Sequence, residues 1–97
     1  MKIDLDGRKI LSNEDFHRAL AEVMDFGPYY GKNLNALWDR LTRDIERPIR
    51  LTWNYASVSR AALGDEDFRQ IIDLLCDVER EDRELGYAEK FEFFMVD

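Results

Sequence analysis

The chain has 97 residues, of which 45% are apolar, so it is long enough for one domain with its own core but too short for two. Its 21 acidic and 14 basic side chains give a net charge of −7, which disfavours nucleic acid or an anionic membrane as partner and favours a basic protein. Cys76 is the only cysteine, so no internal disulfide can form, and no apolar run approaches the ~20 residues that span a bilayer. We therefore expect a single cytoplasmic domain over residues 1–97.

The first half of the chain predicts one strand followed by two helices. Residues 2–7 alternate apolar and polar side chains and end in a glycine, as a short strand does. Residues 12–15 then resemble a capping box that opens an amphipathic helix, which residues 25–28 stop. The apolar positions of this helix have i, i+3, i+4, i+7 spacing: Phe16, Ala19, Leu20 and Val23. A second helix is expected from Leu34, capped by Asn33, to about Ile45.

The stretch from residue 28 to residue 39 carries the strongest signal for a binding surface. On the second helix, one apolar stripe is predicted, formed by Leu34, Leu37, Trp38, Leu41 and Ile45. A neighbouring polar flank contains Asn35, Asp39 and Thr42. Two adjacent tyrosines precede this helix, and we expect one to enter the core and the other, together with Trp38, to serve as an interface anchor.

The second half of the chain predicts two further strands separated by helices. Residues 48–53 form the second strand, residues 55–63 a weaker helix and residues 65–84 a long helix with an apolar stripe. Residues 91–96 are apolar almost throughout, as expected of a strand covered on both faces. Since helices separate all three strands, the fold class is α/β, a small three-stranded parallel sheet layered with helices.

Little in the sequence points to catalysis. His17 is the only histidine, and no serine or cysteine lies at a nucleophile elbow, so a surface or structural role is expected for it. Cys76 is expected at the edge of the core among acids that would not activate a thiol. No metal-ligand spacing and no phosphate-binding loop occur, so we expect no enzyme, metal or cofactor. The acids on the long helix (Asp73, Asp77, Glu81 and Glu84) would by themselves be an ordinary solvated face.

One combination of residues resembles a known family. The run Tyr29-Tyr30-Gly31-x-Asn33-Leu34-x-Ala36-Leu37-Trp38-Asp39-x-Leu41 is similar to the signature of the barstar family of bacterial ribonuclease inhibitors. The similarity extends over nearly the whole chain, through Ser12, Asp15 and His17 and then Pro48 and Trp53. The fold of that family is a small parallel sheet flanked by helices, as expected above.

The resemblance implies a protein that blocks the active site of a basic, extracellular-type ribonuclease of the barnase kind. Asp39 matches the central aspartate that takes the place of an RNA phosphate, and Tyr29 matches a residue that packs over the catalytic histidine of the nuclease. Asp77 matches a helix acid that pairs with a nuclease arginine. The surface expected to bind the partner consists of Tyr29, Tyr30, Gly31, Asn33, Asn35, Trp38, Asp39, Thr42, Asp44, Asp77 and Glu81.

Two departures from the family pattern leave the partner open. Asn35 stands where an arginine-binding aspartate is found, and Asp44 stands where an aromatic contact is found, so one charge is lost and another is gained nearby. An acidic module that binds some other basic protein is therefore an alternative, and a small carboxylate enzyme would require a pocket containing one carboxyl of raised pKa. We expect the free protein to be a monomer.

Overall fold

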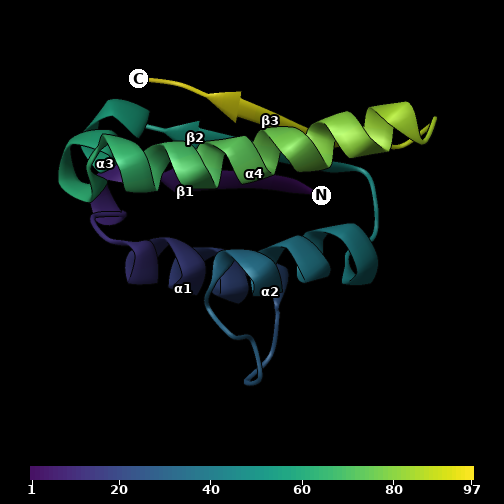
Figure 1. Cartoon of the computed structure of the whole chain (residues 1–97), viewed down its shortest axis with the longest axis horizontal. Helices are drawn as coiled ribbons and strands as arrows, with labels where there is room; N and C mark the ends of the chain where they lie inside the picture. The colour runs from purple at the N-terminus through teal and green to yellow at the C-terminus, as the bar shows by residue number, and fades with distance from the viewer.

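The computed structural model describes residues 1–97 and contains three strands and four α-helices arranged in layers (Figure 1). A 3₁₀ turn at Gly7–Lys9 follows the first strand, and a π-helical turn at Arg40–Asp44 extends the second helix. The elements are β1 (Lys2–Asp6), α1 (Asn13–Met24), α2 (Leu34–Asp39), β2 (Ile49–Asn54), α3 (Ala56–Leu63), α4 (Asp65–Glu84) and β3 (Phe91–Met95).

The three strands form a fully parallel sheet in the order β1-β2-β3, which confirms the predicted α/β class. Each strand is separated from the next by helices, so the connections are long enough for parallel pairing. Ile3 lies beside Leu51, and Leu51 lies beside Phe93, so these side chains form one row on one face of the sheet. Helices α1 and α4 cover this face, and both contact Trp53 of β2 through their aromatic side chains.

The other face of the sheet is open, which corrects the expectation that the last strand is covered on both sides. Lys2, Arg50 and Glu92 form an exposed row across the three strands. In β3, Phe91 is fully buried, whereas Phe94 is 42% exposed and the Arg50 guanidinium lies 5.5 Å from its ring centroid. The run of apolar residues was misleading because β3 is an edge strand with only one covered face.

Carboxylates from α4 cover the outer edge of β3. The Phe91 N–H donates to Asp82 Oδ2 at 2.7 Å, and the Phe93 N–H donates to Glu79 Oε2 at 2.8 Å. Arg47 donates from Nε and Nη2 to the two oxygens of Asp82, at 2.7 and 3.0 Å. Burial raises the pKa of Asp82, but the hydrogen bonds from Arg47 and Phe91 outweigh it and leave the pKa below its ordinary value. The edge that β3 would offer to another chain is therefore occupied.

Side-chain caps fix where the two helices before β2 begin. Ser12 Oγ accepts the Asp15 N–H at 3.0 Å, and Asn33 Oδ1 accepts the Ala36 N–H at 2.8 Å, as the sequence predicts. The second helix does not stay regular, because after Asp39 it widens into the π-helical turn and becomes extended at Ile45. In that turn the Thr42 hydroxyl donates to the Trp38 carbonyl at 2.6 Å.

Two apolar positions are more exposed than their sequence pattern predicts. Val23 completes the apolar spacing of α1 but is 51% exposed, because the helix packs through Phe16, Leu20 and Met24 instead. Cys76 was expected at the core edge and is exposed on α4. Partial desolvation and the neighbouring acids raise the pKa of its thiol, so the thiolate is disfavoured.

No helix has the length and hydropathy needed to cross a membrane.

Candidate functional site

The loop between α1 and α2 projects farther from the sheet than any other segment (Figure 1). Asp25, Gly27 and Lys32 all have positive φ, so the chain turns sharply as it enters and leaves the loop. Tyr29 lies near its tip and is 91% exposed. A large aromatic side chain with so little intramolecular packing contributes almost nothing to the fold, but it offers much apolar area to a partner.

Tyr30 points the opposite way and anchors the loop to α1. Its side chain is buried, its hydroxyl lies 2.7 Å from His17 Nδ1, and its ring packs 4.8 Å from that of Phe26. Burial raises the pKa of Tyr30 and, together with the nearby Lys32, lowers the pKa of His17. The pair is therefore a neutral, structural contact, and Tyr30 supports the predicted surface from below while offering a partner little area of its own.

The polar flank of α2 lies beside this loop. Asn35 and Asp39 are exposed, and Trp38 is half-buried between the flank and the core. No ion pair or side-chain hydrogen bond within the chain engages Asp39. A carboxylate that is exposed and has no internal partner is available to cations from outside.

Asn33 and Gly31 shape the junction between the loop and α2. In addition to capping the helix, Asn33 donates from Nδ2 to the Gly31 carbonyl at 3.3 Å. A Cβ atom added at Gly31 would lie 3.3 Å from that same Nδ2 and 3.4 Å from the Ala36 Cβ, a tight fit. Both residues are exposed and could contact a partner. They also hold the loop against the start of α2, so a substitution at either position would alter the local backbone as well as the surface.

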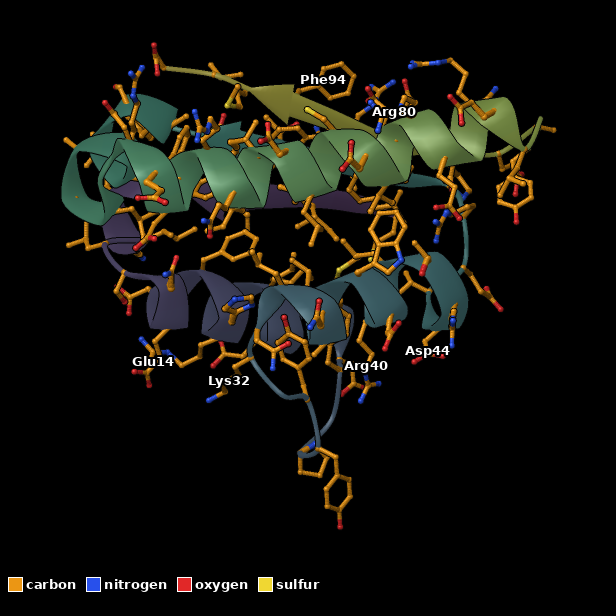
Figure 2. The ribbon with its side chains drawn as sticks, in the orientation of Figure 1. Glu14, Lys32, Arg40, Asp44, Arg80 and Phe94 are labelled. Carbon is orange, nitrogen blue, oxygen red and sulfur yellow. The ribbon has the colours of Figure 1, made fainter.

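The π-helical turn adds charges of both signs to the same side of the molecule. Lys32, Arg40 and Asp44 all lie on the side away from the sheet (Figure 2). Arg40 approaches Asp44 to 3.7 Å and lies 5.7 Å from the Phe26 ring centroid. The charge gained at Asp44 is thus balanced by Arg40 within the chain. Thr42 is half-buried, and its hydroxyl already donates a hydrogen bond to the Trp38 carbonyl.

Helix α4 borders this surface across a groove. Asp77 forms an ion pair with Arg80, and Glu81, one turn further along, is half-buried. The groove between α2 and α4 has a volume of about 370 Å³ and brings the predicted residues Asn35, Trp38 and Asp77 together. Its walls also contain Asp73, which the sequence placed only on a solvated acidic face, and Gln70, for which the sequence made no prediction.

The largest hollow lies elsewhere, between α3 and the start of α4, with a volume of about 700 Å³. The exposed Arg60–Asp65 ion pair is part of its wall, and its lining residues include no histidine, serine or cysteine. No group of three or more histidine, cysteine or acidic side chains is arranged to hold a metal ion. The surface around Asp39 and Tyr29 is therefore the better candidate for the functional site.

Comparison with known proteins identifies the family of the chain. The family model described as "Barstar (barnase inhibitor)" matches residues 1–96. A relative from Bacillus subtilis (strain 168), named "Putative ribonuclease inhibitor YrdF", is 38% identical over 73 residues, in a match that covers 73% of this chain and 80% of the relative. Both matches are to inhibitors, which confirms the expectation that this protein is not an enzyme. The chain belongs to the barstar family.

Proposed function

We propose that the protein inhibits a barnase-type ribonuclease by placing the Asp39 carboxylate where the enzyme holds an RNA phosphate. The observation that carries the proposal is the exposure of Asp39 without an internal ion pair or hydrogen bond. A ribonuclease gathers cationic side chains to bind phosphate, so a carboxylate that enters the cleft meets several charge-assisted donors at once. Family membership supports the same role.

The loop contributes a second anchor in this proposal. Tyr29 supplies a rigid aromatic side chain at the tip, and its neighbour Tyr30 holds the loop through His17. Because the loop is already fixed, less conformational entropy is lost on docking than would be lost by a mobile segment. We expect Tyr29 and Asp39 to enter the cleft together, with Trp38 at the margin.

The physiological role that follows is protection of the cell that makes the nuclease. An inhibitor present in the cytoplasm would form a one-to-one complex with any ribonuclease that folds before export. This complex requires no cofactor and no metal. The free inhibitor is proposed to be a monomer, with the loop surface left open.

Replacing Asp39 by alanine tests the proposal. Close charge pairs in the barnase–barstar complex have coupling energies of about 1.5–7 kcal/mol, so a loss of several kcal/mol in binding is expected on that precedent. Inhibition of barnase would be titrated with the unchanged chain, with Asp39→Ala and with Asp4→Ala, which removes an exposed carboxylate from the open face of the sheet. Equal inhibition by the unchanged chain and Asp39→Ala would contradict phosphate mimicry.

The folded state must be shown to survive these substitutions. Asp39 is exposed and forms no intramolecular ion pair or side-chain hydrogen bond, so urea unfolding of Asp39→Ala should give nearly the same free energy as the unchanged chain. The same titration, repeated with a basic protein that is not a ribonuclease, distinguishes a ribonuclease inhibitor from a general acidic module. Tight binding to that protein, with no binding to ribonuclease, would favour the alternative.

A further inference from the structure

A separate polar hollow lies where the first two turns of α1 and α4 meet the start of α2, and its volume is about 370 Å³. Leu34 and Ile71 are its apolar lining residues, and the rest of the lining carries amide, imidazole, ammonium and carboxylate groups. Lys32 supplies one positive charge and Asp67 supplies one negative charge. Because these charges balance, the hollow suits a neutral polar ligand better than an ion.

His17 directs an unpartnered polar atom into this hollow. The side chain is only 4% exposed, and its Nδ1 lies 2.7 Å from the Tyr30 hydroxyl, which has no other hydrogen-bond partner. The hydroxyl proton is satisfied only if Tyr30 donates to Nδ1, which leaves the proton of the neutral ring on Nε2. No enclosed side-chain nitrogen or oxygen lacks a partner, yet Nε2 has none within the chain, so Nε2 is reached from outside through the hollow.

The other polar groups of the hollow are also available to a ligand. The Asp67 carboxylate forms no ion pair, and its only hydrogen bond comes from Asn13 Nδ2, 3.3 Å from Oδ2. The Lys32 ammonium forms no ion pair or hydrogen bond within the chain. The hollow therefore presents two donors, His17 Nε2 and Lys32, together with a carboxylate acceptor. A ligand that matches it carries acceptors and donors side by side.

We propose that this hollow binds the guanine base of a neutral nucleoside. Guanine presents the acceptors O6 and N7 next to the two donors at N1 and N2. The two N–H groups donate to the Asp67 carboxylate, while O6 and N7 accept from His17 Nε2 and the Lys32 ammonium. Leu34 and Ile71 provide apolar surface for the ring, as in other pockets that hold a single base.

The same groups select against other ligands. Adenine has an acceptor at N1, so the Asp67 carboxylate would face a lone pair in place of a donor. A nucleotide carries a phosphate, which the net charge of −7 on the chain repels. The proposal concerns a free base or nucleoside and does not depend on the proposed inhibition of a ribonuclease.

The first test follows His17 by NMR during titrations of the isotopically labelled chain. His17 is the only histidine, so its imidazole signals are unambiguous. Guanosine should shift them in a saturable way, whereas inosine, which lacks the N2 amino group, should bind about tenfold more weakly because one hydrogen bond to a charged group is lost. Adenosine should bind more weakly still, and guanosine monophosphate should bind more weakly than guanosine.

The second test repeats the guanosine titration with two variants of the first turn of α4. Asp67→Asn keeps the size of the side chain but removes its charge, and it should weaken guanosine binding about tenfold or more. Glu66→Gln is the matched control, because Glu66 is exposed in the same turn but lines the hollow on the α3 side. Its affinity for guanosine should change less than about twofold.

The outcomes decide each part of the proposal. An absence of any His17 response to guanosine, or an equal response to guanosine, inosine and adenosine, overturns the guanine site without the use of a variant. Equal affinities of Asp67→Asn and the unchanged chain overturn the role of the carboxylate. Tighter binding of guanosine monophosphate than of guanosine shows that the ligand is an anion and overturns the assignment to a neutral nucleoside. None of these results bears on the inhibition lost in Asp39→Ala.

Discussion

At the scale of single residues, the local sequence pattern predicts that one of the two adjacent tyrosines is buried, but it does not predict which one. The sequence predicts that one enters the core and one faces outward, because the fold has little use for two aromatic rings on a polar flank. The choice between them depends on His17, which lies 13 residues earlier and meets the Tyr30 hydroxyl only in the folded chain. A histidine beside Phe16 on the buried side of α1 was the available signal, but its partner could not be read from the spacing.

The His17–Tyr30 contact predicts how stability depends on pH. The folded state lowers the pKa of His17 below its ordinary value of 6.5, through burial first and Lys32 second. The neutral imidazole is thus favoured in the native state, whereas the unfolded chain binds a proton at about 6.5. This contribution to stability is complete above pH 6.5 and is lost as the pH falls through the lowered folded pKa.

Urea unfolding at a series of pH values measures this effect. The free energy of unfolding should decline as the pH is lowered from 7 towards 5, whereas His17→Gln should show a flatter profile over the same window. The Asp82 carboxylate does not titrate in this window, because the hydrogen bonds from Arg47 and the Phe91 N–H hold its pKa below its ordinary value of 3.8. Parallel profiles for the two proteins would show that His17 is not the group responsible.

At the scale of elements, the helices were easier to predict than the surroundings of the strands. Caps and apolar stripes are local, so α1 and α4 begin where Ser12 and the acids after Gly64 place them. The surroundings of β3 depend on contacts between distant segments, and the π-helical turn after Asp39 has no signal in the sequence pattern. The apolar composition of residues 91–96 could not reveal that α4 closes the strand edge with the Asp82 carboxylate.

The ion pair behind that edge predicts a large effect of one substitution. Arg47→Ala should lower the free energy of unfolding by about 3–5 kcal/mol, because it leaves the Asp82 carboxylate buried without its cation. Arg50→Ala is the control, since its contact with Glu92 is long, at 3.9 Å, and exposed to solvent. That variant should lose about 1 kcal/mol or less. Equal losses in urea unfolding would mean that Asp82 is stabilised by its backbone contact alone.

At the scale of the whole molecule, charge is distributed in a way the sequence only partly predicts. The net charge of −7 and the candidate acids are evident from composition. The structure adds that Asp44 and Asp77 have intramolecular arginine partners, whereas Asp39 and Asp73 do not. Because pairing depends on which side chains meet, a list of acids cannot separate the balanced charges from the free ones. The free Asp39 carboxylate is the feature that the proposed inhibition requires.

The overall charge also predicts how the complex forms. The molecule measures 35 × 29 × 22 Å, so at about 0.01 M salt, where the Debye length is about 30 Å, an approaching basic nuclease experiences the field of the whole inhibitor. Stopped-flow association with barnase should slow by about 10- to 1,000-fold as salt rises to about 1 M, while dissociation changes little. Asp39→Ala should behave in the opposite way, with much faster dissociation and a nearly unchanged salt slope, because its carboxylate acts at short range in the dry interface. An association rate that does not change with salt would show that the net charge does not steer recognition. The affinity would then come from contacts made after docking.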